Sequence, residues 1–280
     1  MCRNLAFAAT ALCLIGASAQ AARPASPPPT LPGAAAPAPP QPAQQPPPAP
    51  PPVKMTATER AEAARMDPLA RAALWSHAVE IDARDLDAGV KLAKALRELG
   101  RYDDALAATD RVLVIDPNNL EGLLESARTR IAQGQGFFAI DPAQRAQAAA
   151  PKDWRPVSLL AIALEQAQRD DEALVAHQRA LTLAPNNPAM LSNLAMYFAA
   201  HGQSADAETL LRRAVEMPGA TAQVRQNLAL ILGLAGHVDE AERLARHDLP
   251  PNVVANNIAY LRPAPTAAPE RSWASVRGAP

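Results

Sequence analysis

Cysteine is nearly absent from this sequence. Its two cysteines, Cys2 and Cys13, both lie close to the N-terminus, inside a segment that we expect to be removed on export. The chain that remains after removal has no thiol. We therefore predict neither a disulfide nor a cysteine-ligated metal site.

Aromatic residues and net charge are also low. Aromatics make up 4% of the residues, and 27 lysines and arginines nearly balance 28 aspartates and glutamates, for a net charge of −1. No basic face stands out. A nucleic-acid-binding function is therefore not expected.

The sequence lacks the motifs of common hydrolases, metalloenzymes and phosphate-binding proteins. It has no Gly-x-Ser-x-Gly elbow and no His-Glu-x-x-His pair, and residues 134–136 (Gly-Gln-Gly) lack the lysine of a phosphate loop. His201 and His237 adjoin glycines that suit turns, which favours exposed turn positions. We predict no catalytic residue, no cofactor and no metal.

The N-terminus has the pattern of an export signal. Arg3 precedes an apolar run over residues 5–15, and small residues with Ala-x-Ala cleavage patterns follow up to residue 22. The run is too short to span a bilayer stably. We expect residues 1–22 to be a signal peptide and the protein to be periplasmic.

Cys13 leaves a second interpretation of this segment open. A cysteine that ends a short apolar run is where bacterial lipoproteins are cleaved and acylated. Leu12, just before it, is larger than that signal prefers. The sequence is thus compatible with a plain signal peptide or with lipidation at Cys13, the latter tethering the chain to the outer membrane.

Of the 29 prolines, 19 lie near the two ends of the chain, in residues 23–53 and 263–280. Residues 23–53 are a tract of proline and alanine that we predict to be a disordered linker, extended as polyproline II at about 3 Å per residue. Its simplest role is a spacer, and recognition by a proline-binding partner is the alternative. Residues 263–280 are predicted to be a disordered tail, in which Trp273 is a candidate anchor.

A 34-residue repeat dominates the rest of the chain. Repeats begin at residues 86, 120, 154, 188 and 222, and the frame does not slip. Position 8 holds Ala93, Ala127, Ala161, Ala195 and Ala229, position 20 holds Ala105, Ala139, Ala173, Ala207 and Ala241, and position 15 holds Gly100, Gly134, Gln168, Gly202 and Gly236. A period of this length is typical of helix hairpins.

Each column has a physical reason. Small residues at positions 8 and 20 let the two helices of a hairpin cross closely, and glycine at position 15 takes a positive φ in the turn. Pro117, Pro151 and Pro185 share position 32 and end the second helix. The pattern resembles the tetratricopeptide repeat, which implies an all-α fold, a right-handed superhelix of helix-turn-helix repeats.

The predicted repeat domain covers residues 54–262. It has a partial repeat at 54–85 and a C-terminal capping helix at 252–261. Pro142 falls inside the second helix of the second repeat, so we expect that helix to be broken and to restart at Asp141, with Phe137 and Phe138 in an irregular segment.

A groove on the first helices is the predicted binding surface, because helix-hairpin arrays bind peptides there. The candidate groove residues are Lys91, Lys94, Arg97 and Arg128 in the early repeats and Asn193, Met196, Asn227 and Leu230 in the late ones. The groove would be basic at one end and apolar at the other. The two asparagines share position 6 and are candidates to bond a peptide backbone.

Three segments carry a closer resemblance. They are DWRPVSLLAIALEQ (153–166), VRQNLALILGL (224–234) and DLPPNVVANNIAYLR (248–262). With the export signal and proline tract they resemble the TadD-type lipoproteins of tight-adherence (Flp) pilus assembly. The resemblance implies a non-enzymatic factor whose partners are the pilus secretin or other Tad components.

The alternative is a general periplasmic or outer-membrane scaffold in envelope assembly. An enzyme with repeats as its substrate arm is a third class, which lacks a second domain for an active site.

Overall fold

The computed structural model describes residues 54–261, and the predicted signal peptide, Cys13, the linker and the tail lie outside this range. The described part contains thirteen α-helices and no strand. The helices are α1 (Ala57–Ala63), α2 (Pro68–Ile81), α3 (Leu86–Glu98), α4 (Tyr102–Ile115), α5 (Leu120–Ala132), α6 (Gly136–Ala149), α7 (Trp154–Gln166), α8 (Asp170–Leu183), α9 (Pro188–Ala200), α10 (Ser204–Glu216), α11 (Ala222–Leu234), α12 (Val238–Ala245) and α13 (Pro251–Leu261).

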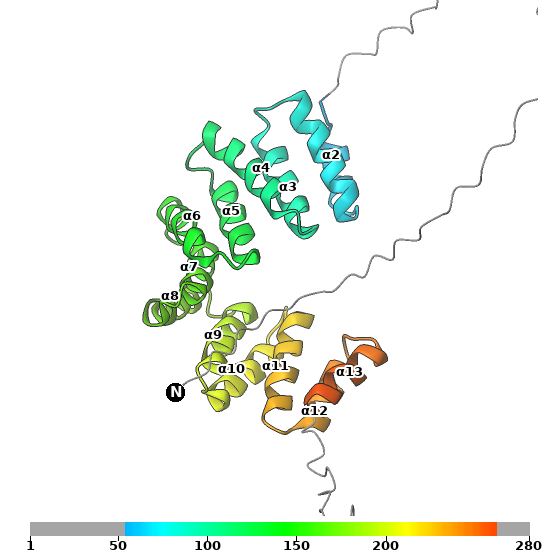
Figure 1. Ribbon diagram of the computed structural model, residues 1–280, viewed down its shortest axis with the longest axis vertical. Coiled ribbons are helices and arrows are strands. Elements are labelled where there is room, and N and C mark those ends of the chain that lie inside the picture. Colours follow the sequence, from blue (N-terminus) through cyan, green and yellow to red (C-terminus); the bar gives the residue numbers. More distant parts are fainter. Residues whose placement is uncertain (1–53, 262–280) are drawn as a thin grey trace, which may run out of the picture. The chain divides into compact units, whose positions relative to one another are not determined.

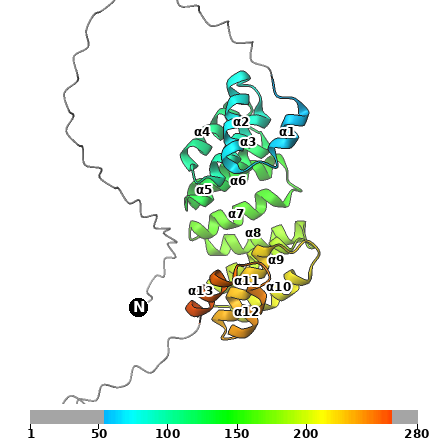
Figure 2. The same ribbon diagram turned by 90° about the vertical axis from the view of Figure 1, so that its right-hand side faces the viewer.

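The helices pack in chain order as a superhelical stack of hairpins. Each helix from α2 to α12 contacts the next one, and the first helices of successive repeats also touch, as α3 does α5 and α9 does α11. Figures 1 and 2 show this succession from α1 to α13. The all-α fold predicted from the 34-residue period is confirmed.

The alanine columns form the hairpin interfaces, as predicted. All five residues at position 20 are 0% exposed, and those at position 8 are 0% exposed except Ala229, at 7%. A methyl group is the largest side chain that such close crossings accept without displacing a backbone. The core is therefore a row of close helix–helix contacts between small residues along the stack, and leucines fill the space between the helix pairs.

The left-handed turn predicted at position 15 is present in all five repeats. The four glycines at position 15 have φ between 73° and 90°, and Gln168, which replaces glycine in the third repeat, has φ 59°. A non-glycine residue in the left-handed region carries a steric cost. The superhelix therefore imposes the turn on Gln168 against its own preference.

Caps that the sequence reading did not identify start the first helices. Asp85, Asn119, Asp153 and Asn187 occupy one column, and each side chain accepts a bond of 2.8 to 3.0 Å from a backbone N–H in the first turn. An acceptor at this position satisfies a donor that the helix leaves without a partner. The first four repeats thus begin at a fixed residue, whereas Thr221, which occupies the same column in the fifth repeat, makes no side-chain cap bond.

The prediction for Pro142 is wrong. Helix α6 runs unbroken from Gly136 to Ala149 with Pro142 inside it. Proline removes a bond to the carbonyl of Phe138, but Phe138 is 59% exposed, so solvent can reach that turn. Pro142 itself is buried in the stack. Packing along the whole helix outweighs the loss of one backbone bond, and it places Phe137 and Phe138 on the helix.

Candidate partner-binding groove

Two of the predicted basic groove residues are bound to a buried carboxylate. Glu125 in α5 is 1% exposed, Arg97 donates to one of its oxygens, and Arg128 lies 3.4 Å from the other. A buried carboxylate is strongly unfavourable without such partners. Arg97 and Arg128 therefore neutralise the buried carboxylate of Glu125, and the three side chains together keep one net positive charge.

The two lysines differ in their surroundings. The Lys91 ammonium lies 2.7 Å from the Asp87 carboxylate and 4.8 Å from the centre of the Trp75 ring, so it is held by an ion pair and a cation–π contact. Lys94 is exposed and has no side-chain partner among residues 54–261. Of the four predicted cations, Lys94 keeps its charge fully available to a ligand.

Both predicted asparagines join neighbouring repeats. The Asn193 amide donates to the Ser158 hydroxyl at 3.1 Å, and the Asn227 amide donates to the Ser192 hydroxyl at 2.9 Å. Gln223 in turn donates to the Asn227 carbonyl at 2.9 Å. These bonds fix the orientation of each carboxamide and leave each amide with one further N–H for a ligand.

The apolar groove residues lie at the C-terminal end. Met196 is half-buried and packs against the core cluster that α9 to α13 share. Leu230 is 39% exposed and lines a pocket between α11, α12 and α13. The late half of the predicted groove thus leads into a defined cavity.

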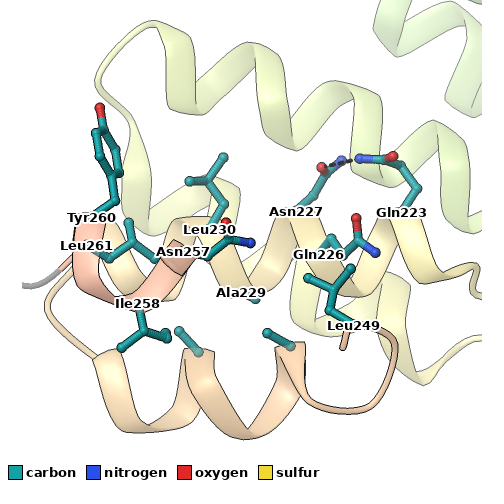
Figure 3. A pocket seen from close by; sticks show the side chains of 12 residues that line it. Gln223, Gln226, Asn227, Ala229, Leu230, Leu249, Asn257, Ile258, Tyr260 and Leu261 are labelled. Atoms are coloured by element: carbon teal, nitrogen blue, oxygen red, sulfur yellow. Dashed lines mark hydrogen bonds between the residues drawn. The ribbon is translucent and has the colours of Figure 1, made fainter. Parts of the chain in front are cut away.

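This pocket is uncharged. It has a volume of about 340 Å³ and is lined by Gln223, Gln226, Asn227, Ala229, Leu230, Ala241, Ala245, Leu249, Asn257, Ile258, Tyr260 and Leu261. Figure 3 shows three carboxamides along α11 followed by Leu230, facing side chains from α13. A groove with amide donors and acceptors above an apolar floor suits an extended, neutral peptide segment.

The capping helix α13 builds one wall of the pocket. Its Val254 and Ile258 are 2% and 5% exposed, and Leu261 lies so close to Gly233 that a Cβ there would come within 2.4 Å of the leucine Cδ1. Sequence reasoning missed Asn257 and Tyr260 as pocket residues. Helix α13 is a capping helix outside the repeat columns. The repeat pattern therefore did not predict which face of α13 packs against α11.

An ion pair anchors the chain that leads to α13. The Arg225 guanidinium in α11 donates two bonds to the Asp248 carboxylate, at 2.6 and 2.7 Å. The bonds from Arg225 hold the pKa of the Asp248 carboxyl below its usual value. Because two parallel bonds fix both position and angle, this pair holds the segment before α13 against α11.

The histidines do not form a ligand cluster in the described residues. His201 and His237 are exposed beside their turn glycines, as predicted, whereas His177 is 2% exposed and bonded to Glu165. Residues 54–261 contain no group of histidine, cysteine, aspartate or glutamate that could hold a metal ion. Within the same range no helix has the length and apolar character needed to cross a membrane.

The comparisons with known proteins agree with this architecture. A tetratricopeptide-repeat family model matches residues 189–217. A search of curated protein sequences finds no match.

Solved structures of similar fold are numerous. A thermophilic tetratricopeptide-repeat protein of Thermus thermophilus aligns with a TM-score of 0.57 and 24% identity over 63% of this chain and 98% of its own. A tetratricopeptide-repeat protein of Parabacteroides merdae gives 0.61 and 14% over 73% and 79%, and pilF of Pseudomonas aeruginosa gives 0.51 and 18% over 64% and 86%. The chain therefore contains a tetratricopeptide repeat at residues 189–217 and has the tetratricopeptide-repeat fold across its described helices.

Proposed function

We propose that this protein is an exported, non-enzymatic scaffold that binds partner proteins through the groove of its first helices. The observation that carries the proposal is the uncharged pocket between α11, α12 and α13, where carboxamides lie beside an open apolar floor. The tetratricopeptide-repeat fold supports it, because stacked helix hairpins present extended binding surfaces.

The pocket suggests the chemistry of the ligand. Carboxamides both donate and accept hydrogen bonds, which matches the alternating N–H and C=O groups of an extended backbone. Leu230 and Ile258 offer apolar contact for one side chain of that segment. A charged side chain would lose its hydration here without finding a counter-charge. The preferred ligand is a neutral, extended segment with a hydrophobic residue.

Pilus assembly is the proposed setting. Residues 153–166, 224–234 and 248–262 resemble TadD-type lipoproteins of the tight-adherence pilus, and pilF of Pseudomonas aeruginosa shares the fold. In this proposal the protein acts in the periplasm, tethered to the outer membrane if Cys13 is acylated, and assists the pilus secretin. A general scaffold in envelope assembly is the alternative, and crosslinking in whole envelopes separates the two by the partner recovered.

A pair of leucine variants tests the binding site. Leu230 and Leu234 are both exposed on α11, but only Leu230 lines the pocket. In a strain that carries Leu230→Asp we expect loss of surface pili and fewer secretin multimers, whereas Leu234→Asp should behave like the parent. Equal effects of the two variants would exclude the pocket as the partner-binding site. The absence of any effect of Leu230→Asp in a stably folded protein would exclude it too.

Lipidation is tested by mass. An acylated chain begins at Cys13 and carries the mass of its lipid, whereas cleavage after Ala19 or Ala21 gives a chain that begins at Gln20 or Ala22. The mass of the protein purified from envelopes decides between them.

A further inference from the structure

An exposed aromatic pair lies on α6, in the second helix of its repeat. Phe137 and Phe138 are 69% and 59% exposed, with ring centres 5.5 Å apart and ring planes at 84°. Leaving two phenylalanines in water is unfavourable, and on a folded surface such a pair is typical of an interaction site. The proposed pocket between α11 and α13 makes no use of them.

The pair borders a separate cavity of about 510 Å³ between α4, α5 and α6. Ile140, 7% exposed, contributes to its apolar lining. Around the rim lie Arg130 and Gln144, whose side chains have no hydrogen-bond partner within residues 54–261, and Arg169, which pairs with Glu172 at 2.7 Å. The cavity therefore combines two aromatic rings with several N–H donors.

This combination fits a polyproline II segment. Proline has no backbone N–H, so a run such as residues 46–52, in which six of the seven residues are proline, offers carbonyl acceptors and a single backbone donor, and its rings pack against aromatic faces. Aromatic-lined grooves recognise proline-rich segments in this way because the extended helix is already formed before binding. The donors on Arg130 and Gln144 match these carbonyls. Residues 24–53 carry no charged side chain, so they do not conflict with Asp110 and Asp141, which also line the cavity.

We propose that the cavity beside Phe137 and Phe138 binds the proline tract of this chain, residues 23–53. The tract joins the described structure at Lys54, next to α1. At about 3 Å per residue its 31 residues reach about 90 Å, and five helix spacings of about 10 Å separate α1 from α6. Because tract and cavity are on one chain, binding is intramolecular and tolerates weak contacts.

Docking would shorten the linker. A bound tract would keep the repeat domain close to the N-terminal end of the chain. A released tract would let the repeat domain lie farther from that end. The proposal does not depend on the C-terminal pocket, since the two sites share no lining residue.

Fluorine NMR of the full chain labelled with 4-fluorophenylalanine tests this directly. The chain has four phenylalanines, namely Phe7, Phe137, Phe138 and Phe198, and single Phe→Leu variants assign their signals. The comparison chain has serine in place of the six prolines at 46–48 and 50–52, so the tether keeps its length. We expect the Phe137 and Phe138 signals to shift by more than a linewidth between the two chains, while Phe198 stays in place.

Two further measurements sharpen the result. Free peptide of residues 40–53, added to the serine chain, should return both signals toward their original positions, and Arg130→Ala in the parent chain should displace them. Signals that do not differ between the parent and serine chains would overturn the proposal. Signals that shift on dilution would assign the aromatic pair to a second copy of the protein and would also overturn it.

Discussion

The carboxamide of Asn227 in α11 donates a hydrogen bond of 2.9 Å to the hydroxyl of Ser192 in α9, 35 residues earlier. The same pair of columns meets one repeat before, where Asn193 donates to Ser158 at 3.1 Å. Position 6 of one repeat thus binds position 5 of the preceding repeat. These bonds tie first helices together along the groove and hold the carboxamides at fixed angles to any ligand.

Replacing either asparagine by alanine should weaken the stack. Each variant loses one hydrogen bond between repeats, which lowers the free energy of unfolding by about 1 kcal/mol. Asn227→Ala also frees Gln223 at the pocket, so it alone should reduce peptide binding there. Urea unfolding checks the stability, and titration with a neutral hydrophobic peptide checks the binding. A loss of binding in Asn193→Ala of equal size would argue against a specific role for Asn227.

Glycine at position 168 should stabilise the protein. Gln168 has φ 59°, a conformation that costs most residues energy and glycine little. After allowing for the greater freedom of glycine in the unfolded chain, we expect Gln168→Gly to raise the free energy of unfolding by about 0.5 to 1 kcal/mol. Gly202→Gln, the reverse change at φ 78°, should lower it. Denaturant midpoints of the two variants that move in the same direction would contradict this explanation.

A larger residue at position 20 should disrupt a hairpin. Ala207 in α10 is 0% exposed, so Ala207→Leu forces the two helices apart at a cost of about 1 to 3 kcal/mol. Ala205 in the same helix is exposed, and Ala205→Leu is the matched control with an expected change near zero. Thermal unfolding followed by circular dichroism measures both. Equal melting temperatures would show that the crossing is less tight than the structure has it.

His201 gives the stability a defined pH dependence. The bond between its Nδ1 and the Tyr197 carbonyl, at 2.8 Å, is the main cause that raises its pKa above the ordinary 6.5, and Asp170 adds to the increase, opposed by partial burial. The negative charge of Glu165 also raises the pKa of His201. A raised folded-state pKa means that this contribution is complete below about pH 6.5 and is lost as pH rises through the folded-state value.

An NMR titration of the His201 ring checks that pKa. In Asp170→Asn one favourable charge is removed, so the pKa should fall and the melting temperature should depend less on pH around neutrality. A pKa for His201 that is unchanged in this variant would show that Asp170 does not contribute.

Much of the fold was predictable because tetratricopeptide-like hairpins are local. The alanine columns, the turn glycines and the prolines after α4, α6 and α8 each act within a few tens of residues, so the sequence displays them in order. The break at Pro142 was predicted wrongly because a helix propensity ignores packing. Ala139, Ala143 and Ala146 hold α6 against its neighbours on both sides of the proline.

The sequence alone determined which residues lie on the first helices, because their position in the repeat assigns them there. Whether a side chain there is available to a ligand was decided by tertiary structure, because availability depends on partners one repeat away. Arg97 and Arg128 share the carboxylate of Glu125, and Asn193 and Asn227 bind serines. Leu230 is partly exposed in the pocket that it lines together with α13. A repeat sequence fixes the period and the helix faces, since these follow from local geometry; contacts between repeats decide which of those faces remain for a partner.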